Sequence, residues 1–328
     1  MKEFEIIDRY FKQFSKDLDP HIKIAIGDDS ASIDIPSLMQ HANNLLITTD
    51  TLVENTHFLS TQPPASIGYK SLAVNLSDIA AMGGTPKWVL LNLTLPNYNE
   101  QWLQEFSHGF AELISLHNLT LIGGDTTQVK NNGPISISIT VLGLSAQDNM
   151  SRTGAVIDDG IFITGNLGEP CYVLDRLLSN QDVRDRNKLY YPLPRVQAGQ
   201  FVNTYATSAI DLSDGLLADL GHILKQSNKA AVIDANKLPV AELLMNNQDA
   251  ILREKYYKYV LAGGDEYEIL FTAPMKFKSI LEEHTPAKVT QIGVIKDKHI
   301  LDANKHYNNI IIENLDIKLD NLGWEHFG

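Results

Sequence analysis

The sequence predicts a mixed α/β or α+β protein that is built from two domains. Strand-like apolar runs alternate with helix-like segments along the chain, which is the pattern of this class. The alternation restarts after about residue 150, so we place the domains at residues 1–150 and 151–328. A chain of 328 residues with 44% apolar and 20% charged residues is long enough to bury a sizeable core in two domains.

In the first half, residues 4–14 are typical of an amphipathic helix, and IKIAIGDDSASIDI (22–35) of two short strands joined by a turn. LLITTD (45–50) is predicted as a third strand. Residues 65–82 carry apolar side chains at helical spacing, and Gly83, Gly84 and Pro86 end that helix. A strand, a long amphipathic helix, a strand that enters a Gly-Gly-Asp turn, and a half-buried strand are predicted at residues 88–95, 99–118, 120–127 and 135–144.

The second half begins with a loop and a strand, followed by a helix around residues 171–179. Residues 180–194 are polar and contain prolines, which indicates an excursion or loop. SAIDLSDGLLADLGHILKQS (208–227) predicts a strand, an acidic turn and a helix. YVLAGGDEYEILFTAP (259–274) places a second Gly-Gly-Asp turn between apolar segments.

Composition excludes several classes of protein. The 27 basic and 40 acidic residues give a net charge of −13, which argues against nucleic acid as the main partner. No apolar run reaches the roughly 18 residues that a membrane span needs, and the N-terminus has no signal-peptide core. The single cysteine, Cys171, cannot form an internal disulfide. We therefore expect a cytoplasmic protein.

Acidic residues recur where strands are predicted to end. Asp29, Asp50, Asp125, Asp211 and Asp214 follow apolar runs, and Asp78 lies inside the helix at 65–82. Each aspartate alone is better explained by a turn or a helix cap, because turn and cap chemistry is so common. Gathered in one cleft, however, they would repel one another unless cations lay between them. Mg²⁺ suits such hard oxygen ligands and bridges to phosphates, so an acidic protein could bind ATP in this way. Thr48 and Thr49 would add hydroxyl or carbonyl oxygens beside Asp50.

Common nucleotide and hydrolase motifs are absent from the sequence. There is no GxxxxGK[ST], no HRD or DFG set, and no HExxH, GxSxG or paired CxxC. Arg152, in SRTGA, is equally compatible with a solvated loop and with a phosphate contact.

Eight motifs, in order, together resemble one family. They are IGDDSA, TTDTLVENTHF, AVNLSDIAAMGGTP, LIGGDTT, SRTGA, AIDLSDGLLADLGHI, GGDEYEILFT and GWEHF. This series is similar to the thiamine-monophosphate kinase family, a branch of the superfamily of aminoimidazole ribonucleotide synthetase and selenophosphate synthetase, and it spans nearly the whole chain.

The resemblance implies a two-domain aminoimidazole ribonucleotide synthetase-like fold whose N-terminal sheet domains pair in a homodimer. It implies transfer of the ATP γ-phosphate to thiamine monophosphate, assisted by several Mg²⁺ ions. The implied metal ligands are Asp29, Thr48, Thr49, Asp50, Asp78, Asp125, Asp211 and Asp214. The implied ATP contacts are Gly124, Asp125, Arg152 and Ser213. His57, Asp265 or Glu266, and Trp324 match the substrate positions. No catalytic base is expected, since the nucleophile is already a phosphate oxygen.

Two positions depart from the usual family pattern. Asn55-Thr56 replace a Gly-Val pair, which bears on the placement of His57. GGDEYE reverses the commoner GGEDYE order, so either Asp265 or Glu266 could contact the substrate. The alternatives are an amidine-forming or selenophosphate-type member of the superfamily, or a scaffold that binds metal and nucleotide without turnover. The position of Cys171 argues against the selenophosphate type, and the complete aspartate set argues against a decayed site.

Overall fold

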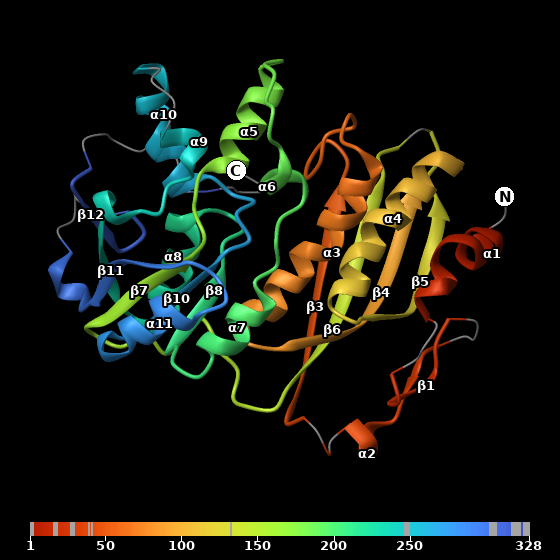
Figure 1. Ribbon diagram of the computed structural model, residues 1–328, viewed down its shortest axis with the longest axis horizontal. Helices are drawn as coiled ribbons and strands as arrows, with labels where there is room; N and C mark the ends of the chain where they lie inside the picture. The colour runs from red at the N-terminus through yellow and green to blue at the C-terminus, as the bar shows by residue number, and fades with distance from the viewer. Residues whose placement is uncertain are drawn as a thin grey trace. The chain divides into compact units, whose positions relative to one another are not determined.

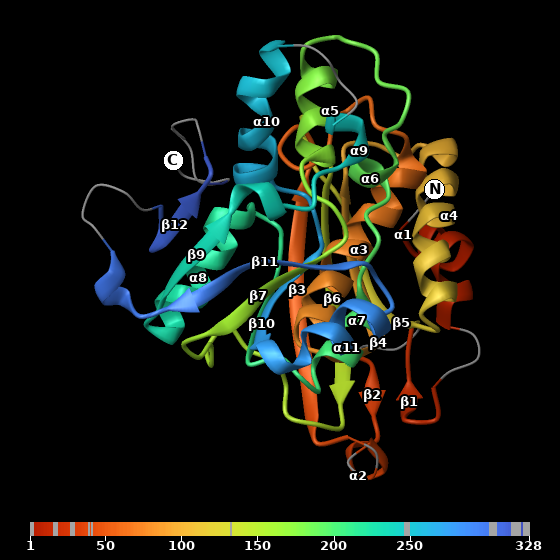
Figure 2. The same cartoon turned by 60° about the vertical axis from the view of Figure 1, so that its left-hand side comes forward.

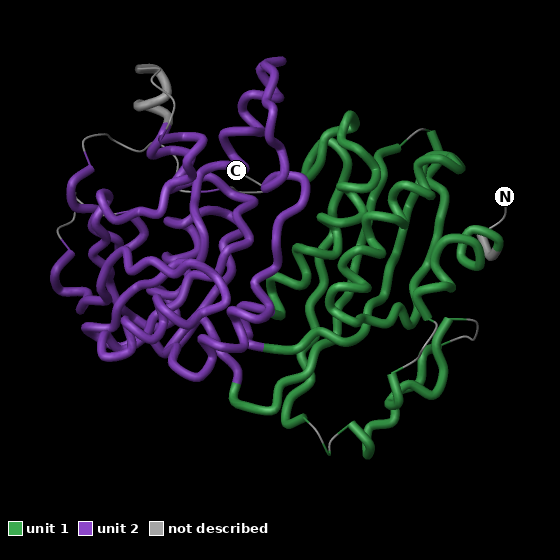
Figure 3. The backbone as a smooth tube through the Cα atoms, in the orientation of Figure 1, with its two compact units in different colours: residues 1–79, 84–148 green, residues 80–83, 149–328 purple. Residues whose placement is uncertain are grey.

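The structure is a computed structural model. It describes residues 3–15, 19–26, 30–38, 40, 42–131, 133–245, 250–301, 307–315 and 323. The chain divides into two compact units, which Figure 3 shows in different colours. Unit 1 comprises residues 1–79 and 84–148, and unit 2 comprises residues 80–83 and 149–328.

Unit 1 is built on a four-stranded sheet in the order β3-β6-β4-β5. The strands are β3 (Asn44–Val53), β4 (Thr85–Leu95), β5 (Thr120–Gln128) and β6 (Ser136–Ser145). β6 pairs antiparallel with β3 and β4, whereas β4 and β5 are parallel. α3 (Pro64–Ala81) and α4 (Glu100–Leu116) cover one face of this sheet, as both Figure 1 and Figure 2 show. We call this the helix face and the other the open face.

Short elements complete unit 1. β1 (Ile22–Ile24) and β2 (Ser32–Ile33) form an antiparallel pair, and α2 (Ile35–Leu38) follows. Ile22 and Leu38 pack with Trp88 and Ile122 and so cover one end of the open face. The predicted N-terminal helix is only a single α-helical turn, α1 (Glu3–Ile6), which continues as π-helical and 3₁₀ turns to Ser15.

Unit 2 contains a six-stranded sheet in the order β12-β9-β11-β7-β10-β8. Its strands are β7 (Asp159–Thr164), β8 (Ser208–Asp211), β9 (Ala230–Asp234), β10 (Ile269–Pro274), β11 (Val289–Lys296) and β12 (Ile310–Glu313). Only the β12–β9 pair is parallel. All six residues of β7 are buried, because this strand lies inside the sheet between β11 and β10.

The helices of unit 2 are α5 (Glu169–Leu178), α6 (Asn187–Tyr190), α7 (Val196–Val202), α8 (Leu216–Ser227), α9 (Glu242–Met245), α10 (Ala250–Ala262) and α11 (Lys278–His284). α5, α8 and α10 contribute Val173, Leu220 and Val260 to the main apolar core. The predicted mixed α/β class is confirmed. Among the described residues, no helix has the length and apolar character to cross a membrane.

Candidate functional site

Two carboxylates of unit 1 lie on the helix face of the sheet. The Asp50 backbone N–H donates to Asn75 Oδ1 of α3 at 3.1 Å, and the Thr48 hydroxyl donates to Asp78 Oδ2. Burial, followed by the negative charge of Asp78, raises the pKa of Asp50 to about 7. These oxygens form a donor set of the kind that Mg²⁺ prefers, and a cation there would relieve the repulsion between the carboxylates.

Asp50 does not stand at a strand end, as the sequence analysis expected, but within β3, which continues to Val53. The strand continues because residues 44–53 all pair with β6. Side chains alternate along a strand, so Thr49 points to the open face, away from Thr48 and Asp50. The Thr49 hydroxyl donates to the Ile139 carbonyl at 3.1 Å and accepts from Thr140. The metal-ligand prediction for Thr49 therefore concerns its backbone carbonyl and not its hydroxyl.

Asp125 lies on the opposite edge strand. The expected Gly-Gly-Asp turn is instead continuous β5, in which Asp125 pairs with Asn92 of β4. Gly124 has φ +149°, and a Cβ there would lie 1.9 Å from the Leu91 carbonyl oxygen, so the strand can approach β4 only with glycine at this position. Thr94 and Thr127, two residues further along, share a 3.0 Å hydroxyl contact and confirm the pairing. Asp125 is therefore exposed on the open face.

The segment after β3 places His57 in a tight turn. Asn55 takes the left-handed conformation (φ 63°), which asparagine tolerates better than most residues, so it can stand where the family usually has glycine. His57 Nδ1 accepts the Val53 backbone N–H at 3.0 Å. In the neutral ring, Nε2 then carries the proton and can donate to an anion. The buried Lys70 of α3 donates to the His57 carbonyl at 3.4 Å, so helix and turn are tied together.

In unit 2, the acidic turn lies between β8 and α8. Asp211 is the last residue of β8 and is buried. The turn after it is held by Asp219, whose Oδ2 accepts the backbone N–H groups of Ser213, Asp214 and Gly215, each at 3.1 Å. Burial, and then the charge of Asp214, raises the pKa of Asp219 to about 7. Asp219 therefore orders the backbone that carries Asp214, a predicted metal ligand, and Ser213, a predicted ATP contact.

The two acidic residues of the GGDEYE turn occupy different environments. Asp265 is half-buried and has φ 64°, and its Oδ1 accepts from the Tyr267 hydroxyl at 2.9 Å. Glu266 is only 3% exposed, and its carboxylate accepts from the Gly168 N–H and from Lys188. The geometry thus favours Asp265 for the substrate contact that the sequence left open between them.

Three further predicted positions are Arg152, Asp29 and Trp324. Arg152 is exposed in the loop before β7, where its carbonyl accepts from Ser227. Asp29 and Trp324 lie outside the described residues, so their predicted roles in metal and substrate binding stay predictions. Sequence reasoning overlooked Lys70, Asp219 and Lys188. A lysine among the apolar residues of a helix was the available signal for Lys70, and an aspartate four residues after Gly215 was the signal for Asp219.

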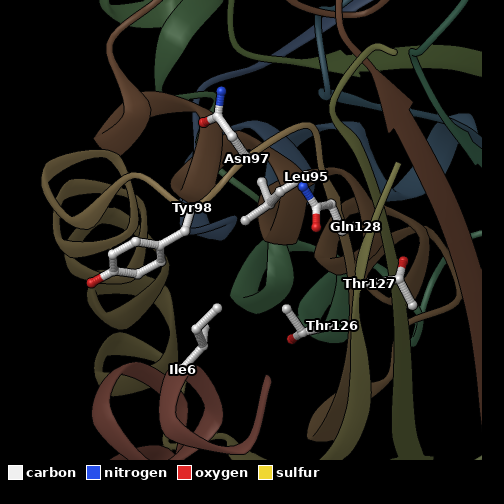
Figure 4. Close-up of a pocket in the computed structure, with 7 residues that line it drawn as sticks. All are labelled: Ile6, Leu95, Asn97, Tyr98, Thr126, Thr127 and Gln128. Carbon is white, nitrogen blue, oxygen red and sulfur yellow. The ribbon is translucent and has the colours of Figure 1, made fainter. Parts of the chain in front are cut away.

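A cavity of about 420 Å³ lies elsewhere in unit 1 (Figure 4). It is lined by Ile6, Leu95, Asn97, Tyr98, Thr126, Thr127 and Gln128. This lining contains no ionisable acid or base other than the Tyr98 phenol, so it lacks the charges that would hold a phosphate or a divalent metal. The carboxylate groups described above are the better candidates for that chemistry.

Known proteins are similar to this chain in sequence. Residues 27–145 match the family described as AIR synthase related protein, N-terminal domain. The chain is 44% identical to the thiamine-monophosphate kinase of Buchnera aphidicola subsp. Acyrthosiphon pisum over 309 residues, which covers 92% of this chain and 88% of that protein.

Solved structures agree. The crystal structure of thiamine-monophosphate kinase from Stenotrophomonas maltophilia K279a superposes with a TM-score of 0.80 at 35% identity, covering 95% of this chain and 97% of that one. AaThiL complexed with AMPPCP and TMP superposes with a TM-score of 0.74 at 28% identity, covering 99% of this chain and 97% of that one.

Proposed function

The chain belongs to the thiamine-monophosphate kinase family, and we propose that it transfers the γ-phosphate of ATP to thiamine monophosphate, giving thiamine diphosphate and ADP. The observation that carries this proposal, beyond family membership, is the oxygen cluster of Thr48, Asp50 and Asp78 on the helix face of unit 1. AaThiL has been solved with AMPPCP and TMP, which supports ATP and thiamine monophosphate as the two substrates here.

We assign Mg²⁺ to both acidic groups. Thr48, Asp50 and Asp78 would hold it in unit 1, and Asp211 and Asp214 in unit 2. Asp29, Asp125 and the Thr49 carbonyl complete the proposed ligand set. The ions would bridge the phosphates and offset the charge that develops during transfer. Gly124, Asp125, Arg152 and Ser213 are the proposed ATP contacts.

The protein's own residues are proposed to position the reactants without an essential general base. A phosphate oxygen of thiamine monophosphate is already ionised at neutral pH, so no side chain has to remove a proton from it. His57 is the proposed contact to that phosphate, and its ring is oriented by the hydrogen bond that Nδ1 accepts from the Val53 N–H. Asp265, and Trp324 outside the described residues, are the proposed contacts to the rest of the substrate.

We propose that the protein is a homodimer that pairs through the open face of unit 1. Ile47 is 65% exposed and Leu45 42% exposed on this face of edge strand β3. Two exposed apolar side chains on the same face of an edge strand are typical of a surface that another subunit covers. Ile47→Arg should then yield monomers in light scattering, whereas Leu116→Arg, at an equally exposed position on α4, should stay dimeric. A dimeric Ile47→Arg protein would contradict this interface.

The proposed activity is tested by incubating the purified full-length protein with ATP, Mg²⁺ and thiamine monophosphate and separating the products by chromatography. Equal amounts of thiamine diphosphate and ADP, both abolished by EDTA, are expected. ADP without thiamine diphosphate would point to another acceptor and to another activity of the superfamily. No turnover at all would favour a non-catalytic scaffold. We place the reaction in the cytoplasm, where ATP is available.

A further inference from the structure

The GGDEYE turn has an unusual backbone that needs support. Asp265 and Tyr267 both take left-handed conformations, at φ 64° and 51°, on either side of Glu266. Such conformations persist in residues other than glycine only where the surroundings impose them. The identity of those surroundings therefore decides where the Asp265 carboxylate points.

One support is the acidic turn of β8. The Asp265 N–H donates to the Ser213 carbonyl at 2.9 Å, and the Tyr267 N–H donates to the Leu212 carbonyl at 2.8 Å. Gly264 permits this approach, because a Cβ at that position would lie 2.5 Å from the Ser213 oxygen. The segment proposed to bind substrate is thus hydrogen-bonded to the segment proposed to bind ATP.

The other support is a buried network of ion pairs that joins Lys188 and Arg195 to Glu266 and Glu268. Lys188 Nζ lies 2.8 Å from Glu266 Oε2 and 3.7 Å from Glu268 Oε1. Arg195 holds Glu268 with two hydrogen bonds of 2.7 Å, through Nε and Nη2. Both glutamate side chains are 2% exposed and both cationic side chains 19%.

Neighbouring groups make further hydrogen bonds to the charged side chains of this network. Glu266 Oε1 accepts the Gly168 N–H, and Lys188 also donates to the Asn166 carbonyl. The Thr164 hydroxyl donates to Glu268 Oε2 at 2.7 Å and accepts the Ile269 N–H at 2.8 Å. Burial opposes the charge on Lys188, but Glu266 and Glu268 outweigh it and raise the pKa of Lys188. Burial, against the attraction of Lys188, raises the pKa of Glu266 to about 7. Lys188 is therefore the member of the pair that stays charged at neutral pH, and the surrounding hydrogen bonds leave the network little freedom to rearrange.

The two cations come from one stretch of sequence. Lys188 lies in α6 and Arg195 directly precedes α7, so both belong to the polar excursion between α5 and α7. This segment therefore places two positive charges next to the buried side chains of Glu266 and Glu268. Asp265 and Tyr267 alternate with them and join each other through the 2.9 Å hydroxyl–carboxylate bond.

We propose that the Lys188–Glu266 pair, braced by Arg195–Glu268, is a positioning device that sets the orientation of Asp265 for the thiamine end of the substrate. This inference rests on the proposed kinase function. It assigns Glu266 a positioning role and Asp265 the contact, and it gives the excursion a part in substrate specificity. The ATP side keeps a support of its own besides its two bonds to the GGDEYE turn, because Asp219 fixes residues 213–215 through three backbone hydrogen bonds.

The test uses full-length variants and measures KM for thiamine monophosphate and for ATP separately. Lys188→Met should raise KM for thiamine monophosphate about 10-fold or more, because misplacement of a contact residue is costly, and should leave KM for ATP nearly unchanged. Lys296→Met is the matched control. Lys296 also forms a 2.7 Å ion pair in unit 2, with Asp158, but at the surface. Its two KM values should stay within about twofold of those of the unaltered protein.

A double variant separates positioning from folding. Lys188→Met alone leaves the buried Glu266 carboxylate without its lysine partner and should lower thermal stability. Lys188→Met combined with Glu266→Gln removes both partners of the pair and should recover that stability. We expect the double variant to keep the raised KM for thiamine monophosphate. If that KM returned to its original value together with stability, or if it never rose in any folded variant, the positioning role would be wrong.

If the proposed kinase function itself were wrong, the experiment would give a different result. The unaltered protein would then form no thiamine diphosphate, whatever happened at Lys188. If Lys188→Met did not fold, the double variant and Glu266→Gln alone would carry the same comparison of the two KM values. An equal rise in both KM values would also contradict the inference, because it would indicate general disorder of the unit.

Discussion

Asp50 and Asp125 lie on opposite edge strands of one four-stranded sheet and point to opposite faces. Asp50 of β3 pairs with Ile139 of β6, which pairs in turn with Leu91 of β4, and these side chains lie on the helix face. Asp125 of β5 pairs with Asn92 of β4, and both lie on the open face. Two strands, β6 and β4, separate them. One copy of this sheet therefore cannot bring both carboxylates to one metal ion. A site in which both bind one ion would therefore have to take one of them from the partner chain of the proposed homodimer.

This relationship predicts complementation between two inactive variants. If each site combines Asp50 of one chain with Asp125 of its partner, mixed dimers of Asp50→Asn and Asp125→Asn chains contain one intact site and one doubly altered site. Each variant alone should be inactive, and purified mixed dimers should regain about half of the activity of the unaltered dimer. Mixed dimers as inactive as their parents would show that both aspartates act within one chain.

Asp50→Asn should separate catalysis from stability. It removes a ligand oxygen charge, so turnover should fall by about 100-fold or more. It also removes the repulsion from Asp78, worth about 1 kcal/mol, so the midpoint of thermal unfolding in EDTA should rise by about 2–4 °C. Mg²⁺ should raise the midpoint of the unaltered protein and have a much smaller effect on the variant. A variant that kept near-full activity would contradict the metal assignment.

Asp219 should contribute to stability and to ATP binding together. Asp219→Ala leaves three backbone N–H groups of the turn without their acceptor, at a cost of about 2 kcal/mol in the free energy of unfolding. KM for ATP should rise, since Ser213 loses its fixed position. Asp219→Asn keeps an acceptor oxygen, so its free energy of unfolding should fall less and its KM for ATP should rise less. Urea unfolding and steady-state kinetics measure the two effects. Equal losses in the Asp219→Ala and Asp219→Asn variants would argue against the hydrogen-bonding role.

Cys171 should react slowly with alkylating reagents near neutral pH. Burial, followed by the negative charges of Glu266, Asp175 and Asp265, raises the pKa of its thiol to about 12. Only the thiolate reacts, so the rate with iodoacetamide should rise about tenfold per pH unit between about pH 8 and 11. The urea-unfolded chain, whose thiol has an ordinary pKa, is the control and should react far faster at pH 8. A folded protein that reacted at that rate would contradict this environment for Cys171.

The sequence predicted the fold class because hydrophobic periodicity and glycine signals report local structure. The helix of residues 65–82 and the strand before Asp211 appear where that pattern placed them. Periodicity was less informative for Asp50 and Asp125. Both were expected at strand ends, yet both lie within strands, because backbone pairing with β6 and β4 carries the strands through polar residues.

Other features of the site depend on contacts between distant residues, which no local pattern reports. Lys188 and Glu266 are 78 residues apart, and nothing in either segment indicates that they form an ion pair. The choice between Asp265 and Glu266 therefore could not be made from GGDEYE alone. Asn55 is an intermediate case. Its tolerance of a left-handed conformation is a local property, and φ 63° shows that the turn before His57 uses it.

The proposed reaction is transfer of the γ-phosphate of ATP to thiamine monophosphate. ATP labelled with ¹⁸O in the γ-phosphate, incubated with the protein, Mg²⁺ and thiamine monophosphate, tests it by mass spectrometry of the products. We predict that the label appears in the terminal phosphate of thiamine diphosphate and that the ADP formed is equimolar. Label found only in inorganic phosphate, with no labelled thiamine diphosphate, would contradict the account.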